Sequence, residues 1–143
     1  MCSITRANQK EIGTILQLLE KNNLPHQDFG PHVDFFLIMS EKKIAGVIGA
    51  EIYSPYALLR SLAVADSFKK KGMGTRLTVF LLDYLAVHGI NEVFLLTTTA
   101  DKFFNKMGFE TIDRSDAPQQ ILKTKEFSEI CPDSAVCMRY LIY

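Results

Sequence analysis

The amino-acid sequence predicts an α/β protein, in which helices flank a mixed sheet of about six or seven mostly antiparallel strands. Apolar segments joined by tight turns between residues 33 and 64 indicate an antiparallel meander. A helical pattern between two apolar segments, residues 57–64 and 92–97, indicates a central parallel β-α-β unit. The 143 residues suit one domain, placed at residues 1–143, whose core needs no disulfide or metal.

The first third of the chain is expected to form a strand, a helix and a loop. Residues 3–6 have a short strand pattern, and Asn8 followed by Glu11 is typical of a capping box at a helix start. Prolines and a glycine predict an irregular loop over residues 24–32. The helix between them, ending near residues 22–23, is predicted by apolar side chains at helical spacing: Ile12, Ile15, Leu16 and Leu19.

The meander is expected to consist of strands at residues 33–40, 44–53 and 57–64. Gly46 and Gly49 lie inside the second of these strands and indicate a bulge or a close approach of two backbones.

The second half of the chain predicts more helix. From Gly72 an apolar stripe runs as far as Tyr84, and Gly89 suits the end of that helix. Residues 92–97 have the continuous apolar pattern of a strand buried on both faces. Beyond it we expect a helix at 101–107 closed by Gly108, a strand at 109–113, a helix at 118–130 and a last strand at 135–142.

Charge and cysteine content argue against several classes of function. Sixteen basic residues balance sixteen acidic ones, whereas nucleic-acid-binding proteins carry a basic excess. The longest apolar runs, such as residues 35–39, are far shorter than the ~20 residues of a membrane span. Without an apolar signal segment after Met1, and with three cysteines outside any disulfide or zinc spacing, we expect a cytoplasmic protein with no metal.

A basic, glycine-containing loop is the most informative segment. Lys69, Lys70 and Lys71 precede Gly72 and Gly74, which open the predicted helix. The first N–H groups of a helix are unpaired and carry partial positive charge, so a helix start of this kind suits a phosphate. The phosphate-loop and dinucleotide-binding glycine patterns are absent. The alternative for the segment alone is a solvated lysine run before a plain turn.

The wider pattern resembles one enzyme superfamily. Lys69-x-x-Gly72-x-Gly74, preceded by Leu62-x-Val64, is similar to the acetyl-CoA motif [QR]-x-x-G-x-[GA] of the GNAT superfamily of N-acetyltransferases. The segment 103–109, Phe-Phe-Asn-Lys-Met-Gly-Phe, is similar to the second cofactor segment of that superfamily. The order of elements matches over the whole chain, so the resemblance implies a GNAT fold with a central parallel pair of strands that splay apart.

The resemblance also implies how acetyl-CoA binds. The backbone of Leu62 and Val64 would pair with the pantetheine arm, and the amides of residues 70–75 would hold the pyrophosphate. The thioester would lie where the strands of Leu62 and Leu95 separate, and a backbone N–H near Leu62 would stabilise the oxyanion. The expected cofactor-binding residues are Leu62, Ala63, Val64, Lys69, Lys70, Lys71, Gly72, Met73, Gly74, Thr75, Phe103, Phe104 and Lys106.

Two departures from the superfamily pattern matter. Lys69 replaces the usual glutamine or arginine, and Lys70 stands where glycine is common. Phe104 occupies the position of a frequent general-acid tyrosine, and a phenyl ring donates no proton. The thiolate then leaves unaided, since a thiol pKa near 8.5 makes it a tolerable leaving group, or a hydroxyl of residues 97–99 serves, with Thr98 as the candidate. The alternative for these threonines is a strand-end or helix-capping role.

The acceptor side has few candidate residues. Glu51, inside an apolar strand, is the candidate base, and it is either paired with Arg60 or placed in a cleft with a raised pKa. Arg60, with the same ambiguity, is the candidate clamp for an acceptor carboxylate, next to Ser61. The histidines at 26 and 32 belong to the loop that covers the acceptor in the superfamily, although loop histidines are more often surface residues. Cys137 is expected to be a small core residue.

A closer resemblance concerns the acceptor. Residues 57–64, 95–100 and 127–135 are similar to small bacterial acetyltransferases of arsenic-resistance operons. That group implies direct acetylation of the amine of a small anionic amino acid, or of an arsenical or phosphinic analogue. A glutamate-type amino-acid N-acetyltransferase is the nearby alternative, and a non-catalytic acyl-CoA sensor is the alternative from another class. The expected partner is a small-molecule amine, without nucleic acid or membrane, and a homodimer is the candidate assembly.

Overall fold

The structure is a computed structural model that describes residues 2–24, 30–130 and 134–142. The loop histidine His26 and the cysteine Cys131 lie outside the described residues.

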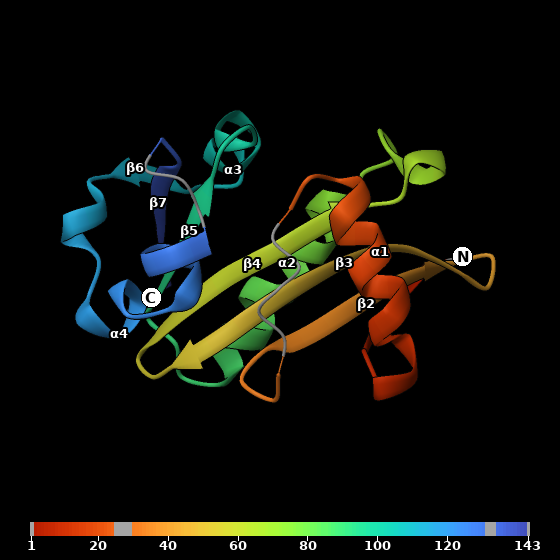
Figure 1. Cartoon of the computed structure of the whole chain (residues 1–143), viewed down its shortest axis with the longest axis horizontal. Helices are drawn as coiled ribbons and strands as arrows, with labels where there is room; N and C mark the ends of the chain where they lie inside the picture. Colours follow the sequence, from red (N-terminus) through yellow and green to blue (C-terminus); the bar gives the residue numbers. More distant parts are fainter. Residues whose placement is uncertain (1, 25–29, 131–133, 143) are drawn as a thin grey trace.

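Within the described residues, seven strands form one mixed sheet (Figure 1). Their order across the sheet is β1-β2-β3-β4-β5-β7-β6, with β4 and β5 parallel and each other described pair antiparallel. The expected meander and parallel unit are therefore confirmed. The strands are β1 Cys2–Arg6, β2 Asp34–Ser40, β3 Lys43–Tyr53, β4 Tyr56–Val64, β5 Glu92–Thr97, β6 Glu110–Ile112 and β7 Val136–Leu141.

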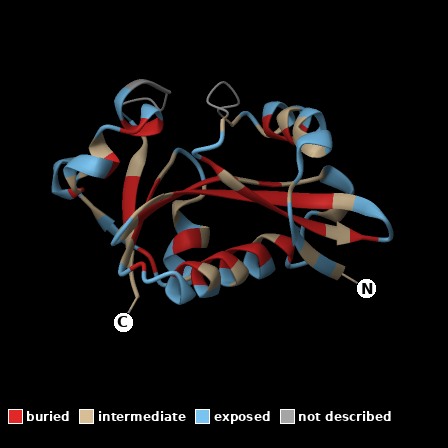
Figure 2. Ribbon diagram, turned by 90° about the horizontal axis from the view of Figure 1, so that it is seen from below, coloured by how far each residue is buried: buried red, intermediate tan, exposed pale blue. Residues whose placement is uncertain are grey.

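Helices cover both faces of this sheet. In Figure 2 the long helix α2 runs below the sheet, while α1 and the segment that contains α4 lie above it. The α2 face buries the largest cluster, which also takes in Phe104 of α3. The helical elements are η1 Gln9–Glu11, α1 Ile12–Lys21, η2 Asp66–Phe68, α2 Met73–Val87, α3 Asp101–Lys106, η3 Arg114–Asp116, α4 Gln119–Leu122 and the π-helix η4 Glu126–Ile130.

The capping box and the first helix confirm the sequence expectation. The Asn8 side chain accepts a hydrogen bond from the amide of Lys10, and the Glu11 carboxylate accepts one from the amide of Asn8. The capped turn, η1, leads directly into α1. Ile15 and Leu19 of the apolar stripe are fully buried against the sheet, because they return to the same helix face every three to four residues.

Strand β4 contains a bulge opposite β3. Val47 pairs with Ala63 and Gly49 pairs with Arg60, so β4 has one residue more than β3 between these two pairs. Ser61, which immediately follows Arg60, has a positive φ of 60°, an uncommon backbone conformation for a residue with a side chain. An extra residue with a left-handed conformation bends a strand and increases its twist.

The bulge also changes which residues of β4 face each side of the sheet. Before it, Leu59 packs in the α2 cluster, while Leu58 faces the α4 side. After it, Leu62 packs against the α2 cluster and Ala63 faces α1. Because side chains alternate along a strand, one inserted residue reverses that alternation. The same strand can therefore present Leu62 to one face and Arg60 to the other.

The prediction of one continuous helix at residues 118–130 is wrong. The segment is divided into α4 and η4, with Thr124 between them. The Thr124 hydroxyl donates to the carbonyl of Ile121, 2.7 Å away, and accepts from the amide of Phe127 at 3.4 Å. A buried threonine that bonds to both neighbouring turns in this way competes with regular helical hydrogen bonding. The break therefore originates at Thr124.

Gly46 lies where two backbones approach closely, as expected, whereas Gly49 lies against a side chain. A Cβ at Gly46 would lie 2.9 Å from the carbonyl oxygen of Ala63, and one at Gly49 would lie 2.9 Å from the Phe35 ring. Gly13 of α1, in contrast, has nothing within 4 Å of such a Cβ.

We predict that Gly46→Ala lowers the free energy of unfolding by about 1–3 kcal/mol, because the added methyl group overpacks a backbone contact. The matched substitution Gly13→Ala should instead raise it by up to about 1 kcal/mol, because alanine is the better helix former. Urea denaturation of both variants measures the difference. Equal effects of the two substitutions would contradict the close approach at Gly46.

Candidate functional site

The candidate site begins where β4 and β5 separate. The two strands pair from Tyr56 with Glu92 as far as Leu58 with Phe94, and no later pair is formed between their described residues. On its other edge, β5 pairs with β7 along its whole length, from Glu92 with Leu141 to Thr97 with Val136. Figure 1 shows the two strands diverging toward α3 and the start of α2. The splayed parallel pair implied by the family resemblance is therefore present.

The bulge of β4 lies at this separation. Leu62 and Val64 follow it, are partly buried and pack against the α2 cluster, whereas Ala63 between them is buried against α1. The backbone from Ser61 onward has no β5 strand beside it, since the parallel pairing ends three residues earlier, at Leu58. An extended ligand segment can therefore lie between this part of β4 and β5.

The start of α2 is open. Gly72 is the N-cap residue with a φ of 79°, it provides no capping side chain, and a Cβ built on it would meet nothing within 4 Å. Lys70 also has a positive φ, of 64°, which explains physically why glycine is common at that position of the motif. Met73 is buried and Thr75 is exposed. The first amides of α2 therefore suit an anion in the way that helix N-termini generally do.

The three lysines before α2 surround its start at the surface. Lys69 forms an ion pair with Asp66, with Nζ 3.0 Å from Oδ1, and both side chains are largely exposed. The Lys71 ammonium lies 5.7 Å from the centre of the Phe68 ring. Exposed pairs of this kind contribute little energy, so a phosphate can replace Asp66 as the partner of Lys69.

Helix α3 places its two phenylalanines differently. The Phe103 ring lies beside Gly74, where a Cβ would be 3.5 Å from the ring edge. Phe104 is buried and packs edge-to-face against Phe103 and Phe109, with ring centres 5.1 Å and 5.4 Å apart. Phe103 is therefore next to the helix start, whereas the Phe104 ring fills the core at the position of the family's frequent tyrosine.

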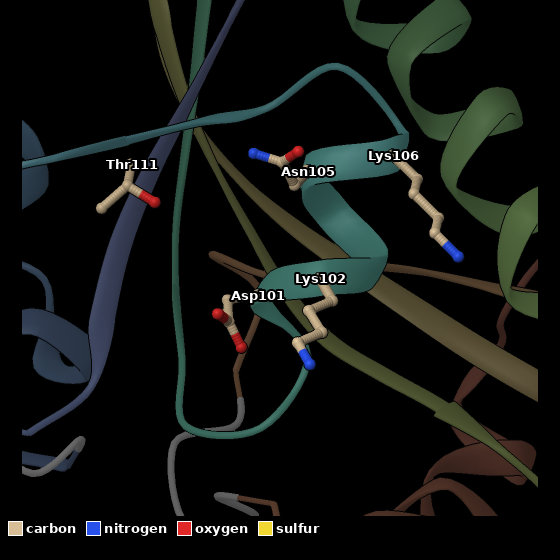
Figure 3. A pocket seen from close by; sticks show the side chains of 5 residues that line it. All are labelled: Asp101, Lys102, Asn105, Lys106 and Thr111. Atoms are coloured by element: carbon tan, nitrogen blue, oxygen red, sulfur yellow. The ribbon is translucent and has the colours of Figure 1, made fainter.

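Lys106 lies on the exposed side of α3. Together with other polar side chains it lines a hollow of about 280 Å³ between α3 and β6 (Figure 3). In Figure 3 the side chain of Lys106 points away from Thr111 of β6, toward the neighbouring helix. The hollow is lined by Asp101, Lys102, Asn105, Lys106 and Thr111.

The threonines after β5 have different surroundings. The Thr97 hydroxyl accepts a hydrogen bond from the amide of Ala100 at 2.9 Å, which is the capping role considered above for these residues. Thr98 is exposed between β5 and α3, next to the separation of the strands. Thr98 therefore stays a candidate on its position alone.

A buried ionic cluster lies on the opposite face of the sheet from α2. The Arg60 side chain is fully buried, and its Nη1 donates to Glu51 Oε2 at 2.7 Å. The Tyr53 hydroxyl donates to the other oxygen of Glu51, and Arg60 Nε donates to the Ser61 hydroxyl at 3.1 Å. Of the two alternatives for Glu51 and Arg60, the ion pair is the one present.

One residue of this cluster, Glu126, was not predicted from the sequence. Glu126, the first residue of η4, has a side chain that is 5% exposed, and its Oε1 lies 3.8 Å from Arg60 Nε. In the sequence Glu126 is one of several charged residues in an expected helix, and no local pattern marks it as buried. Glu126 instead opens η4, the separate helical segment that follows the break at Thr124.

Two further expected residues have different surroundings. His32 is exposed, and Cys137 on β7 is buried among apolar side chains of the α4 side. Across residues 2–24, 30–130 and 134–142, no three His, Cys, Asp or Glu side chains are grouped to hold a metal ion. No helix in this described part combines the length and apolar character that crossing a membrane requires.

We predict that Arg60→Ala lowers the free energy of unfolding by about 3–5 kcal/mol, because it removes the guanidinium that is bonded to the buried Glu51 carboxylate. The matched control is Arg6→Ala, which removes an exposed ion pair with Asp34 and should change stability by less than about 1 kcal/mol. Urea denaturation measures both. A loss below about 1 kcal/mol for Arg60→Ala would contradict a tightly held buried pair.

A second prediction concerns Cys137. Burial raises the pKa of its thiol from 9.0 to about 11, with the nearby Arg114 and Asp116 acting in opposite directions. In the unfolded chain the thiol loses its proton near pH 9, so this contribution to stability is complete below that pH and is lost as the pH rises toward 11. Unfolding free energies of the wild type and Cys137→Ala, measured from pH 8 to 11, should converge with rising pH. Parallel curves would contradict the raised pKa.

Comparison with known proteins shows to which protein family the chain is similar. Residues 5–125 match the model of the acetyltransferase (GNAT) domain. An uncharacterized N-acetyltransferase of Chlorobaculum tepidum is 33% identical over 105 residues, which cover 73% of this chain and 65% of that protein. The chain thus spans about two thirds of the length of this curated relative.

Two solved structures are similar in fold. N-acetylglutamate synthase of Neisseria gonorrhoeae, complexed with coenzyme A and N-acetyl-glutamate, superimposes with a TM-score of 0.83 at 18% identity. The match covers all of this chain and 35% of that one. A GNAT-family acetyltransferase of Staphylococcus aureus Mu50 has a TM-score of 0.78 at 16% identity and is covered completely, as is this chain.

Proposed function

Because the chain belongs to the acetyltransferase (GNAT) domain family, we propose that it is an acetyl-CoA-dependent N-acetyltransferase of small primary amines. The observation that carries the proposal is the combination of the open start of α2 with the separation of β4 and β5. One feature suits a diphosphate and the other suits an extended thioester arm. The two lie at the same end of β4, which leads through η2 into α2.

The residues at α2 fit acetyl-CoA. The space above Gly72 is open, and the amides of the first turn have no capping side chain from the N-cap residue. Lys69, Lys70 and Lys71 supply positive charge to the pyrophosphate and the 3′-phosphate. The backbone of Leu62 and Val64 binds the pantetheine arm in the gap left by β5, and Phe103 packs against its side.

The residues around the bulge support acyl transfer. Acetyl-CoA supplies the acetyl group as a thioester, which an uncharged amine attacks directly. The backbone N–H near Leu62, at the bulge, stabilises the negative charge that develops on the carbonyl oxygen. Phe104 cannot donate a proton, so the thiolate leaves unaided or with the help of the Thr98 hydroxyl.

The acceptor binds on the side of the buried cluster. Glu51 takes the proton of the ammonium group, and Arg60 with Ser61 orients the acceptor. The acceptor is amino-acid-like and anionic, with arsenical and phosphinic amino acids in the same class. Support comes from the charged cluster beside the strand separation and from the shared fold with an enzyme solved with N-acetyl-glutamate.

A panel assay tests the proposal. Release of free thiol from acetyl-CoA is measured with amino acids, phosphinic amino acids and arsenical analogues as acceptors. Turnover with at least one amine is expected. Binding of acetyl-CoA without turnover on any amine would instead support the acyl-CoA sensor, which the missing tyrosine motivates.

For the cofactor site we predict that Gly72→Glu abolishes the thermal protection by acetyl-CoA and reduces thiol release at least about 100-fold, because a carboxylate then occupies the diphosphate site. The control Gly72→Ala has the same positive-φ strain without the charge, so it should lose about 1–2 kcal/mol of stability but retain protection. Undiminished protection in Gly72→Glu would contradict the cofactor assignment.

A further inference from the structure

Thr78 is a buried threonine in the second turn of α2. Its hydroxyl donates a hydrogen bond to the carbonyl oxygen of Gly74, 2.8 Å away. We propose that Thr78 is a positioning residue for the pyrophosphate of acetyl-CoA, and that it acts through the peptide group that joins Gly74 to Thr75. This inference rests on the proposed function, since that function assigns the pyrophosphate to the first amides of α2.

The peptide group between Gly74 and Thr75 presents its two polar ends in opposite directions. Its carbonyl points along the helix toward Thr78, and its N–H points back toward the start of α2. The first hydrogen bond of the helix runs from the amide of Arg76 to the carbonyl of Gly72, at 3.1 Å. The Thr75 amide precedes that bond and has no partner inside the helix, so it is one of the donors that face an anion.

The carbonyl of this peptide group receives more than the usual helical bond. A carbonyl in a regular helix accepts the amide four residues later, and that of Gly74 also accepts the Thr78 hydroxyl. A hydrogen bond to the oxygen of an amide polarises the whole amide and strengthens its N–H as a donor. Thr78 is 0% exposed, so water does not compete for its hydroxyl. The Thr75 N–H is therefore a stronger donor to a phosphate than it would be with the helical bond alone.

The surroundings of Gly74 fix the orientation of the same peptide group. A Cβ at Gly74 would lie 3.5 Å from the Phe103 ring and 4.0 Å from a methyl group of Val64. Phe103 and Val64 thus limit movement at the α-carbon, while the Thr78 hydroxyl holds the carbonyl. A donor that is already held in its bound orientation loses little freedom when the ligand binds.

A threonine inside a helix often bonds to the preceding turn only to satisfy its own hydroxyl. Such a structural role would affect the stability of α2, and it would affect every ligand of the site alike. A positioning role affects the ligands that contact the Thr75 amide and spares those that do not. The two roles therefore differ in how binding depends on the pyrophosphate.

The test compares a ligand that contains the pyrophosphate with one that lacks it. The dissociation constant of CoA is measured by calorimetry, and that of pantetheine by competition with CoA. Thr78→Val removes the hydroxyl at nearly constant shape. The dissociation constant of CoA should rise about threefold, because a charge-assisted hydrogen bond loses its added polarisation, whereas that of pantetheine should change by less than about 1.5-fold.

Three further variants control the experiment. Thr78→Ser keeps the hydroxyl and should restore the wild-type ratio of the two constants, while Thr78→Ala removes it with a smaller side chain and should repeat the ratio of Thr78→Val. Thr14→Val makes the same chemical change at an exposed position of α1 and should alter neither constant. Cooperative thermal unfolding verifies that each variant is folded.

The amide proton of Thr75 reports on the donor itself. In the wild type its NMR resonance should move downfield when CoA binds, because the amide then donates to a phosphate oxygen. In Thr78→Val this movement should be smaller, and in Thr78→Ser it should match the wild type. Movements of equal size in the wild type and Thr78→Val would overturn the polarisation of this peptide group.

The outcomes separate the two proposals. Absence of thiol release with every amine, while CoA still binds, would overturn the proposed function, and the ratio of the two dissociation constants would still decide the role of Thr78. An unchanged constant for CoA in Thr78→Val and Thr78→Ala, or equal rises for CoA and pantetheine, would overturn the positioning role. Failure of CoA to bind the wild type would overturn it as well.

Discussion

The parallel pairing of β4 and β5 ends after the pair of Leu58 with Phe94, and the candidate site depends on that separation. If the pairing continued, the backbone of Leu62 and Val64 would bond to β5 and could not bind a ligand. The separation is possible because the end of β5 is fully paired on its other side by β7. Backbone groups on one edge of β5 are thus satisfied by protein, while the space toward β4 is left for an extended molecule.

The bulge at Ser61 gives the two sides of β4 different chemistry. Without the extra residue, strict alternation would place Arg60 and Leu62 on the same face of the sheet. With it, Arg60 points to the buried cluster under η4, and Leu62 points to the α2 side. Within three successive residues, β4 thus presents a guanidinium to one face of the sheet and an apolar side chain to the other. The positive φ of Ser61 is the local strain that accompanies this arrangement.

The sequence predicts best what depends on neighbouring residues. The open start of α2 follows from Gly72 and its helical stripe, and the strands of the meander follow from apolar runs and turns, so these features were found. The family resemblance supplied the separation of β4 and β5, which no local pattern contains. The break in the expected helix at 118–130 was missed, because a threonine within a helix usually bonds harmlessly to the preceding turn. Here Thr124 bonds to both sides.

The incorrect prediction of a continuous helix also affects what the sequence says about the candidate site. A continuous helix at 118–130 offers no reason to bury Glu126, so the charge balance around Arg60 could not be derived from the sequence. Glu126 adds a second buried carboxylate beside Arg60, with Oε1 at 3.8 Å from Nε.

The zero net charge of the chain conceals an uneven distribution of its charged side chains. Exposed lysines at the start of α2 are screened by salt within about 8 Å at physiological ionic strength, so they act mainly at contact with phosphates. The ion pair of Arg60 with Glu51 is buried and is screened much less. Ionic strength should therefore weaken the interactions of the exposed lysines and leave the buried pair largely unchanged.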